Sequence, residues 1–184
     1  KSAMRFFFTL EPNVAEDHYS LPPLERWDLE EILTLIDQKK YFLLHAPRQT
    51  GKTTCLLALA DYLNLEGRYR AVYANIEAAQ AARERVEVGM AAVVQTIANG
   101  ARWSLQDENA QTLARQVLQE QAALVALEGF LTRWCEASPL PVVLLLDEVD
   151  ALVGDTLISL LRQLRAGYPK RPTQFPQTVI LCGV

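Results

Sequence analysis

Short apolar runs alternate with longer stretches of helical periodicity along most of the chain. Four runs are short, apolar and bounded by turn residues, which is typical of buried strands; they cover residues 41–46, 70–76, 142–147 and 178–184. Between them, apolar residues recur every three or four positions, as on one face of a helix. This alternation predicts an α/β fold with a mostly parallel sheet flanked by helices.

Residue types at the ends of the helical stretches predict where several helices begin and stop. A helix over 28–38 has Asp28 as its expected N-cap. A second helix covers 52–66, and Gly67 is a natural C-terminal stop for it. Asp155 is the expected N-cap of a later helix.

The segment 78–138 is almost wholly helical in pattern and is rich in Ala, Gln, Leu and Glu. We expect it to break near Asn99 and Gly100, because Asn and Gly disfavour a helix interior. Asp107 is the expected N-cap of one long helix that follows the break, and Pro139 ends the segment.

Composition narrows the classes of protein without changing the fold prediction. The chain has 184 residues, half of them hydrophobic, as in ordinary globular domains. Its net charge of −4 does not support binding to nucleic acid, which remains possible through a local basic patch. The three cysteines form no CxxC or Cys/His cluster, which favours reduced thiols and a cytoplasmic protein. Because no apolar run reaches the roughly 18 residues that span a bilayer, we expect no membrane partner.

The stretch "APRQTGKTT" (46–54) joins the first predicted strand to the helix over 52–66. It fits the phosphate-binding Walker A pattern G-x-x-x-x-G-K-[ST], except that Ala46 replaces the first glycine. That position ends a strand, and Pro47 biases its predecessor toward extended backbone, so alanine is acceptable there. A chance GKT is the alternative, which the strand before and the helix after disfavour. The predicted nucleotide-binding residues are Pro47, Arg48, Gln49, Thr50, Gly51, Lys52, Thr53 and Thr54.

Residues in this loop have different expected tasks. Gly51 lets the backbone approach a phosphate without an intervening Cβ. Lys52 is expected to reach the β- and γ-phosphates, and Thr53 to offer its hydroxyl to Mg²⁺. Thr54 is a candidate contact of the α-phosphate.

The stretch "VVLLLDEVD" (142–150) has the pattern of a Walker B strand. Asp147 then lies beside the Mg²⁺ that Thr53 holds, so these two are the predicted metal ligands. Glu148 can polarise a water molecule for attack on the γ-phosphate, which makes Glu148 and Lys52 the predicted catalytic residues. The alternative is that the two acids only give the strand a polar end.

The stretches "APRQTGKTT" and "VVLLLDEVD" together resemble the motifs of AAA-like P-loop ATPases of the additional-strand, catalytic-glutamate group. In pattern they are similar to prokaryotic PRxxGKT ATPases, including AAA+ and STAND-type proteins related to origin-recognition ATPases. The resemblance implies ATP and Mg²⁺ as cofactors. It also implies a three-layer P-loop NTPase fold with strand order 5-1-4-3-2. Strand 5 and a helical lid are then expected past Val184, and a homo-oligomer would form through the ATPase face.

Residues 1–27 contain prolines and show no clear period, which predicts an extended N-terminal arm near the nucleotide site. Residues 28–184 are the expected P-loop ATPase core. In the arm, Arg26 is the candidate counterpart of an arginine that relatives carry near the adenine. The arm is expected to pack on the core and is also a candidate wall for the adenine; the two roles are compatible. At the end of the fourth strand, Cys182 stands where relatives place a polar sensor residue.

The main functional hypothesis is Mg²⁺-dependent ATP binding and hydrolysis that drives a conformational switch. The alternatives are a slow-turnover, nucleotide-gated signalling or scaffold module and a DNA-associated loader ATPase. One basic cluster is either a solvated helix face or a contact with another subunit or DNA; it consists of Arg162, Arg165, Lys170 and Arg171.

Overall fold

The computed structural model describes residues 29–45 and 51–183. For His45 it describes the backbone but not the side chain. The predicted arm 1–27, Asp28, the loop 46–50 and Val184 lie outside the described residues. The described sheet has four parallel strands in the order β1-β4-β3-β2. The strands are β1 (Phe42–His45), β2 (Arg70–Asn75), β3 (Val142–Asp147) and β4 (Thr178–Gly183). This is the order expected for strands 1 to 4, and the predicted α/β fold is confirmed.

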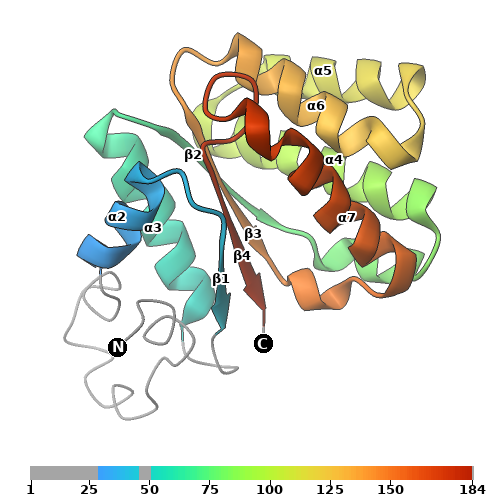
Figure 1. Cartoon of the computed structure of the whole chain (residues 1–184), viewed down its shortest axis with the longest axis horizontal. Coiled ribbons are helices and arrows are strands. Elements are labelled where there is room, and N and C mark those ends of the chain that lie inside the picture. Colours follow the sequence, from blue (N-terminus) through green and yellow to red (C-terminus); the bar gives the residue numbers. More distant parts are fainter. Residues whose placement is uncertain (1–28, 46–50, 184) are drawn as a thin grey trace.

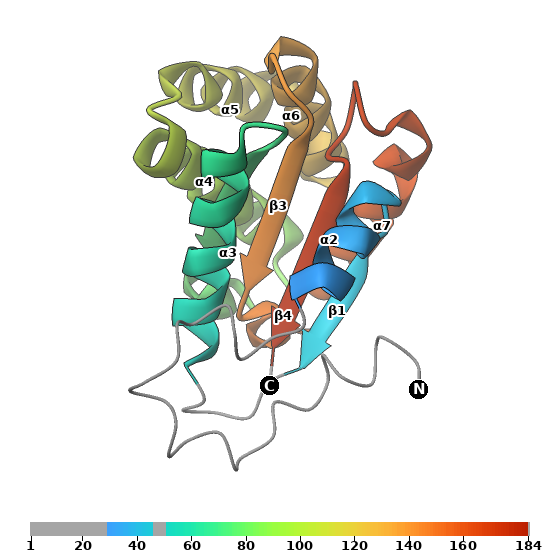
Figure 2. The same cartoon turned by 90° about the vertical axis from the view of Figure 1, so that its left-hand side faces the viewer.

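Helices cover both faces of this sheet, which makes a three-layer structure (Figure 1). Figure 2 shows α2 and α3 on the face opposite to α4–α7. The helices are α2 (Leu29–Asp37), α3 (Lys52–Glu66), α4 (Val86–Leu105), α5 (Glu108–Glu120), α6 (Ala123–Ala137) and α7 (Gly154–Gly167). Shorter 3-10 turns are η4 (Glu77–Ala82), η5 (Val149–Ala151) and η6 (Tyr168–Lys170). Within the described residues, no helix combines the length and the apolar character that crossing a membrane requires.

The strand β3 lies inside the sheet, and all six of its residues are buried. Alternate residues enter two separate apolar clusters. Leu144 and Leu146 join the cluster beneath α4–α7, and Val143 and Leu145 join the cluster beneath α2 and α3. The run "VVLLL" shows no alternation of apolar and polar residues because both faces of this strand are covered.

The expected helix break at Asn99 and Gly100 is wrong. Helix α4 runs without interruption from Val86 to Leu105. A Cβ at Gly100 would lie 2.6 Å from the carbonyl oxygen of Tyr73 in β2. Gly100 therefore lets the helix approach the strand backbone closely, so this glycine serves packing rather than a turn.

Asp107 caps a helix as predicted, but that helix is shorter than expected. Its Oδ1 accepts a hydrogen bond from the backbone N–H of Ala110 at 3.1 Å. The chain then turns at Gln121, so α5 and α6 form an antiparallel pair (Figure 1). The Gln121 side chain occupies the space that a Cβ at Gly129 would need, so the turn depends on a contact with the next helix.

The prediction that Asp155 caps the next helix is also wrong. Helix α7 begins at Gly154, two residues before the expected start at Thr156, with Val153 in the N-cap position. Asp155 lies in the first turn, where its negative charge still suits the helix dipole. Buried Thr156 holds this end of the helix, because its hydroxyl donates to the carbonyl of Arg83 at 2.6 Å.

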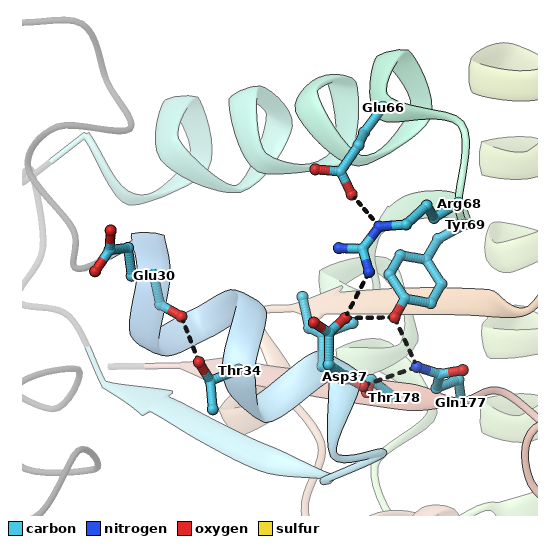
Figure 3. A network of polar contacts seen from close by, with 9 residues as sticks. Glu30, Thr34, Asp37, Glu66, Arg68, Tyr69, Gln177 and Thr178 are labelled. Carbon is cyan, nitrogen blue, oxygen red and sulfur yellow. Dashed lines mark hydrogen bonds and ion pairs between the residues drawn. The ribbon is translucent and has the colours of Figure 1, made fainter.

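A polar network joins the end of α2 to the beginnings of β2 and β4 (Figure 3). The hydroxyl of Tyr69 donates to Asp37 at 2.6 Å, and Arg68 forms an ion pair with the same carboxylate at 3.3 Å. Buried Gln177 donates to the hydroxyl of Tyr69 at 3.0 Å and to the carbonyl of Ile36 at 2.8 Å. These contacts fix α2 at the amino end of the sheet.

Candidate functional site

The carboxyl end of β3 and the amino end of α3 meet at one end of the sheet (Figure 2). β3 ends at Asp147, and α3 begins at Lys52. Gly51 precedes the helix with a φ of 75°, a left-handed backbone that favours glycine. The chain thus directs the first residues of the helix, with its positive dipole end, toward the end of β3.

Four predicted site residues meet at this junction. The Nζ atom of Lys52 lies 3.0 Å from Oδ1 of Asp147 and 3.0 Å from Oε1 of Glu148. The hydroxyl of Thr53 donates to Oδ2 of Asp147 at 3.2 Å. Lys52 is 8% exposed and Asp147 is fully buried, so their charges interact in a medium of low dielectric constant.

Tyr73 is a member of this cluster that the sequence analysis did not find. Its hydroxyl donates to Oδ2 of Asp147 at 2.6 Å. The backbone N–H of Glu148 donates to Oδ1 of the same carboxylate at 2.9 Å. With the contacts of Lys52 and Thr53, both oxygens of the buried Asp147 have hydrogen-bonding partners, as a buried charge requires. A tyrosine in a strand is ordinary, so the pattern of β2 carries no signal for this contact.

The protonation states in the cluster follow from burial and from these contacts. Burial alone would lower the pKa of Lys52, but the bonds to Glu148 and Asp147 outweigh it and raise that pKa. Burial, followed by the bond to Asp147, raises the pKa of Tyr73. At neutral pH Lys52 is therefore a cation and Tyr73 a neutral hydrogen-bond donor.

The backbone of Glu148 is left-handed, with a φ of 61°. This conformation costs a residue with a side chain on the order of 1–2 kcal/mol. The turn ends β3 and starts η5, and it leaves the Glu148 side chain 28% exposed while in contact with Lys52. Backbone strain of this kind gathers at functional sites, which makes Glu148 a functional candidate on geometric grounds.

Oxygen atoms in the cluster fit a magnesium ion. Mg²⁺ prefers oxygen ligands and is usually held by one or two protein groups together with phosphates and water. The Thr53 hydroxyl and the Asp147 carboxylate supply oxygens 3.2 Å apart. In the part of the chain that the structure describes, no group of three or more His, Cys, Asp or Glu could hold a metal ion, so a metal at this site would also depend on the Thr53 hydroxyl, phosphate and water.

Other predicted site residues lie apart from this cluster or outside the described residues. Thr54 is exposed on α3. Cys182 is buried near the end of β4, and burial raises its pKa to about 12, so it is a neutral thiol. Outside the described residues are Arg26 and the loop residues Ala46, Pro47, Arg48, Gln49 and Thr50.

The predicted basic cluster is divided between two roles. Lys170 forms an ion pair with Glu128 at 3.2 Å, and the guanidinium of Arg171 lies 3.2 Å from the ring centroid of Tyr168. Both side chains are therefore used within the domain. Arg162 and Arg165 lie on the exposed face of α7.

Comparison with known proteins assigns the chain to a family. The family model described as "ATPase family associated with various cellular activities (AAA)" matches residues 42–168. This range runs from β1 to the beginning of η6, well over half of the chain, and it includes the whole cluster around Asp147. No curated protein matches the chain. The three-layer fold and the family match agree, and the chain belongs to the AAA family of ATPases.

Proposed function

We propose that the cluster around Asp147 binds ATP with Mg²⁺ and hydrolyses it. AAA family membership suggests ATP binding and hydrolysis by a P-loop ATPase. The observation that carries the finer proposal is the meeting of Lys52, Asp147 and Glu148 at the start of α3. A cation, a buried carboxylate and a partly exposed carboxylate at a helix N-terminus suit a phosphate, a metal ion and a water molecule respectively.

In this proposal the chain binds the phosphates through backbone and side chain together. The N–H groups at the start of α3 point toward the phosphates, and the helix dipole favours their negative charge. Lys52 balances charge on the β- and γ-phosphates and on the transferring phosphoryl group. The Walker A pattern predicts that Pro47, Arg48, Gln49 and Thr50 also bind the nucleotide.

The Thr53 hydroxyl and the Asp147 carboxylate hold Mg²⁺. When bound, Mg²⁺ neutralises charge on the phosphates, which lowers the barrier to phosphoryl transfer. Lys52 and the backbone N–H of Glu148 both contact Oδ1 of Asp147, which leaves its Oδ2 directed toward Thr53.

Glu148 orients the attacking water and accepts its proton. Its side chain is 28% exposed, so water reaches the carboxylate. Lys52 contacts this carboxylate at 3.0 Å, so a phosphate that attracts the ammonium group also frees Glu148 to act as a base. Glu148 leads directly into η5. In this proposal, hydrolysis of ATP beside Glu148 changes the conformation of η5 and so acts as a switch.

Two substitutions test the proposal. Lys52→Ala should abolish tight Mg-ATP binding, because backbone donors alone leave the phosphate charge poorly balanced. Glu148→Gln should retain binding and lose hydrolysis, because the amide cannot accept the proton. Binding is measured by fluorescent ATP titration, and hydrolysis by phosphate release.

Exposed residues supply the matched controls for these substitutions. Lys40→Ala and Glu87→Gln remove the same groups from exposed positions and should leave both measurements unchanged. Normal hydrolysis by Glu148→Gln would show that another group activates the water. Tight binding without turnover in the unmodified protein would favour a slow, nucleotide-gated module over an active ATPase.

A further inference from the structure

We propose that Tyr73 is a positioning residue of the magnesium site, which orients the carboxylate of Asp147 toward Thr53. This inference rests on the proposed function, because it assigns a task within the same site. The contact that carries it is the hydrogen bond of 2.6 Å from the Tyr73 hydroxyl to Oδ2 of Asp147. Oδ2 is also the oxygen that the Thr53 hydroxyl contacts at 3.2 Å.

The two oxygens of Asp147 have different partners. Oδ1 accepts from the backbone N–H of Glu148 at 2.9 Å and lies 3.0 Å from Nζ of Lys52. Oδ2 accepts from Tyr73 and Thr53. If Thr53 and Oδ2 hold the metal ion, Tyr73 is the other donor to that oxygen among the described residues, and it fixes the direction of Oδ2. Groups that orient a metal ligand in this way typically change metal affinity by about 10- to 100-fold when they are removed.

The position of Tyr73 is itself determined from two sides. Its ring is partly buried against the apolar cluster beneath α2 and α3. Its carbonyl oxygen lies so close to Gly100 of α4 that a Cβ there would come within 2.6 Å. Tyr73 therefore presents its hydroxyl from a well-packed strand, and rigid elements hold a site more accurately than loops do.

The register of the sheet explains how the two residues meet. Tyr73 pairs with Leu145, and Asn75 pairs with Asp147. Side chains two positions apart on neighbouring strands lie on the same face and within reach of a long aromatic side chain. A phenylalanine would fill the same apolar space, so the hydroxyl group contributes the specific contact with Asp147.

Tyr73→Phe tests the inference, because it removes the hydroxyl and keeps the ring. The measured quantity is the Mg²⁺ concentration that gives half-maximal binding of fluorescent ATP. We expect this concentration to rise about 10-fold or more, whereas binding in EDTA stays as in the unmodified protein. Circular dichroism and thermal unfolding report whether the variant is folded.

Tyr69→Phe is the matched control. The Tyr69 hydroxyl also donates to an aspartate at 2.6 Å, but this aspartate is Asp37 at the other end of the sheet (Figure 3). Both variants lose one tyrosine–carboxylate bond, and Tyr69→Phe also loses the bond from Gln177, so Tyr69→Phe should lose at least as much stability as Tyr73→Phe. Only Tyr73→Phe should shift the Mg²⁺ dependence.

A double variant tests whether Tyr73 acts through Asp147. In an Asp147→Asn background, Tyr73→Phe should add no further shift in Mg²⁺ dependence. An equal shift in both backgrounds, or an unchanged Mg²⁺ dependence in the single variant, would overturn the inference. If Tyr73→Phe does not fold while Tyr69→Phe does, the Tyr73 hydroxyl contributes more to the stability of the fold than the Tyr69 hydroxyl. The inference that it serves mainly the metal site would then be wrong.

Failure of the inference can be told apart from failure of the proposed function. Mg²⁺-dependent ATP binding that Lys52→Ala abolishes supports the function whatever Tyr73→Phe does. If the unmodified protein shows no such binding, the proposed function fails, and the inference about Tyr73 fails with it.

Discussion

Single aspartates in this domain satisfy several donors at once. Asp147 does so at the candidate site. Asp107 does so at the other end of the sheet, where its Oδ2 lies 3.1 Å from Nη2 of Arg70 and accepts from Nε1 of Trp134 at 3.0 Å. Its Oδ1 caps α5. Because Trp134 is buried, removing this carboxylate leaves an indole N–H without its partner.

We expect Asp107→Ala to lower the free energy of unfolding by about 2–4 kcal/mol, from the lost cap together with the unpaired donors. Urea denaturation measures the change. Asp155→Ala is the matched control: it removes an aspartate from the exposed first turn of α7 and should cost less than about 1 kcal/mol. Equal losses would show that the side-chain contacts of Asp107 contribute little.

Packing between elements depends on small residues where two backbones come close. Helix α4 and strand β2 meet at Gly100, beneath the carbonyl of Tyr73. Helix propensity alone would favour alanine at position 100, because alanine is the better helix former by about 1 kcal/mol. Packing against β2 disfavours alanine there, because the strand backbone cannot move aside as a flexible side chain can.

Gly100→Ala should therefore lower the free energy of unfolding by about 1–3 kcal/mol in spite of its better helix propensity. Ser104→Ala, on the exposed side of the same helix, should be neutral or slightly stabilising. Thermal and urea unfolding of the two variants separate packing from propensity. A stabilised Gly100→Ala protein would mean that α4 and β2 can move apart at little cost.

Strand β2 forms an edge of the described sheet, and one side chain covers part of that edge. Asn64 of α3 accepts from the N–H of Ala71 at 2.7 Å and donates to its carbonyl at 2.9 Å. A neighbouring strand would make the same pair of bonds. Asn64 thus satisfies an edge position that could otherwise pair with another chain.

Asn64→Ala should lower the free energy of unfolding by about 1–3 kcal/mol, because both backbone groups of Ala71 lose a partner. Light scattering should also rise faster during incubation near the unfolding midpoint. Asn64→Asp keeps the acceptor and loses the donor, so its free energy of unfolding should fall between those of the parent and Asn64→Ala. If Asn64→Ala is as stable and as soluble as the parent, the edge needs no cover at this position.

At the scale of the whole molecule, the site and the α5–α6 pair lie at opposite ends of the sheet (Figures 1 and 2). Several buried groups of the folded domain also keep their protons to a higher pH than they would in water, because burial disfavours their charged forms. Burial raises the pKa of Cys135 above its ordinary value of 9.0 and the pKa of Tyr41 above its ordinary value of 10.0. The unfolded chain therefore loses these protons at lower pH than the folded protein does.

This difference predicts alkaline destabilisation. The stability contribution of these groups is complete below pH 9 and falls as pH rises, by up to about 1.4 kcal/mol per pH unit and group. Tyr41→Phe should be less stable at pH 7, because Tyr41 donates to the carbonyl of Pro176 at 2.7 Å. Between pH 10 and 11, however, it should lose about 1 kcal/mol less than the parent. Urea midpoints across this range test the difference, and parallel curves would contradict it.

Local patterns predicted much of the fold. The four strands were located to within a residue or two, and α3 was predicted with its observed ends, Lys52 and Glu66. These features depend on neighbours in the sequence: a buried run of apolar residues, a helical period, a glycine after the last turn. The residues Lys52, Thr53, Asp147 and Glu148 were also predicted together, because motif spacing and strand–helix context carry that signal. Their catalytic and metal-binding roles stay predictions.

The tertiary structure alone decided the features that rest on contacts between distant segments. Asn99 and Gly100 were expected to end a helix, yet Gly100 continues it because β2 lies against it. Tyr73 joined the site only because strand register brings it beside Asp147. The reason is physical: the pattern of one segment records which face it buries, whereas the identity of the partner on that face is determined only when the strands and helices pack together.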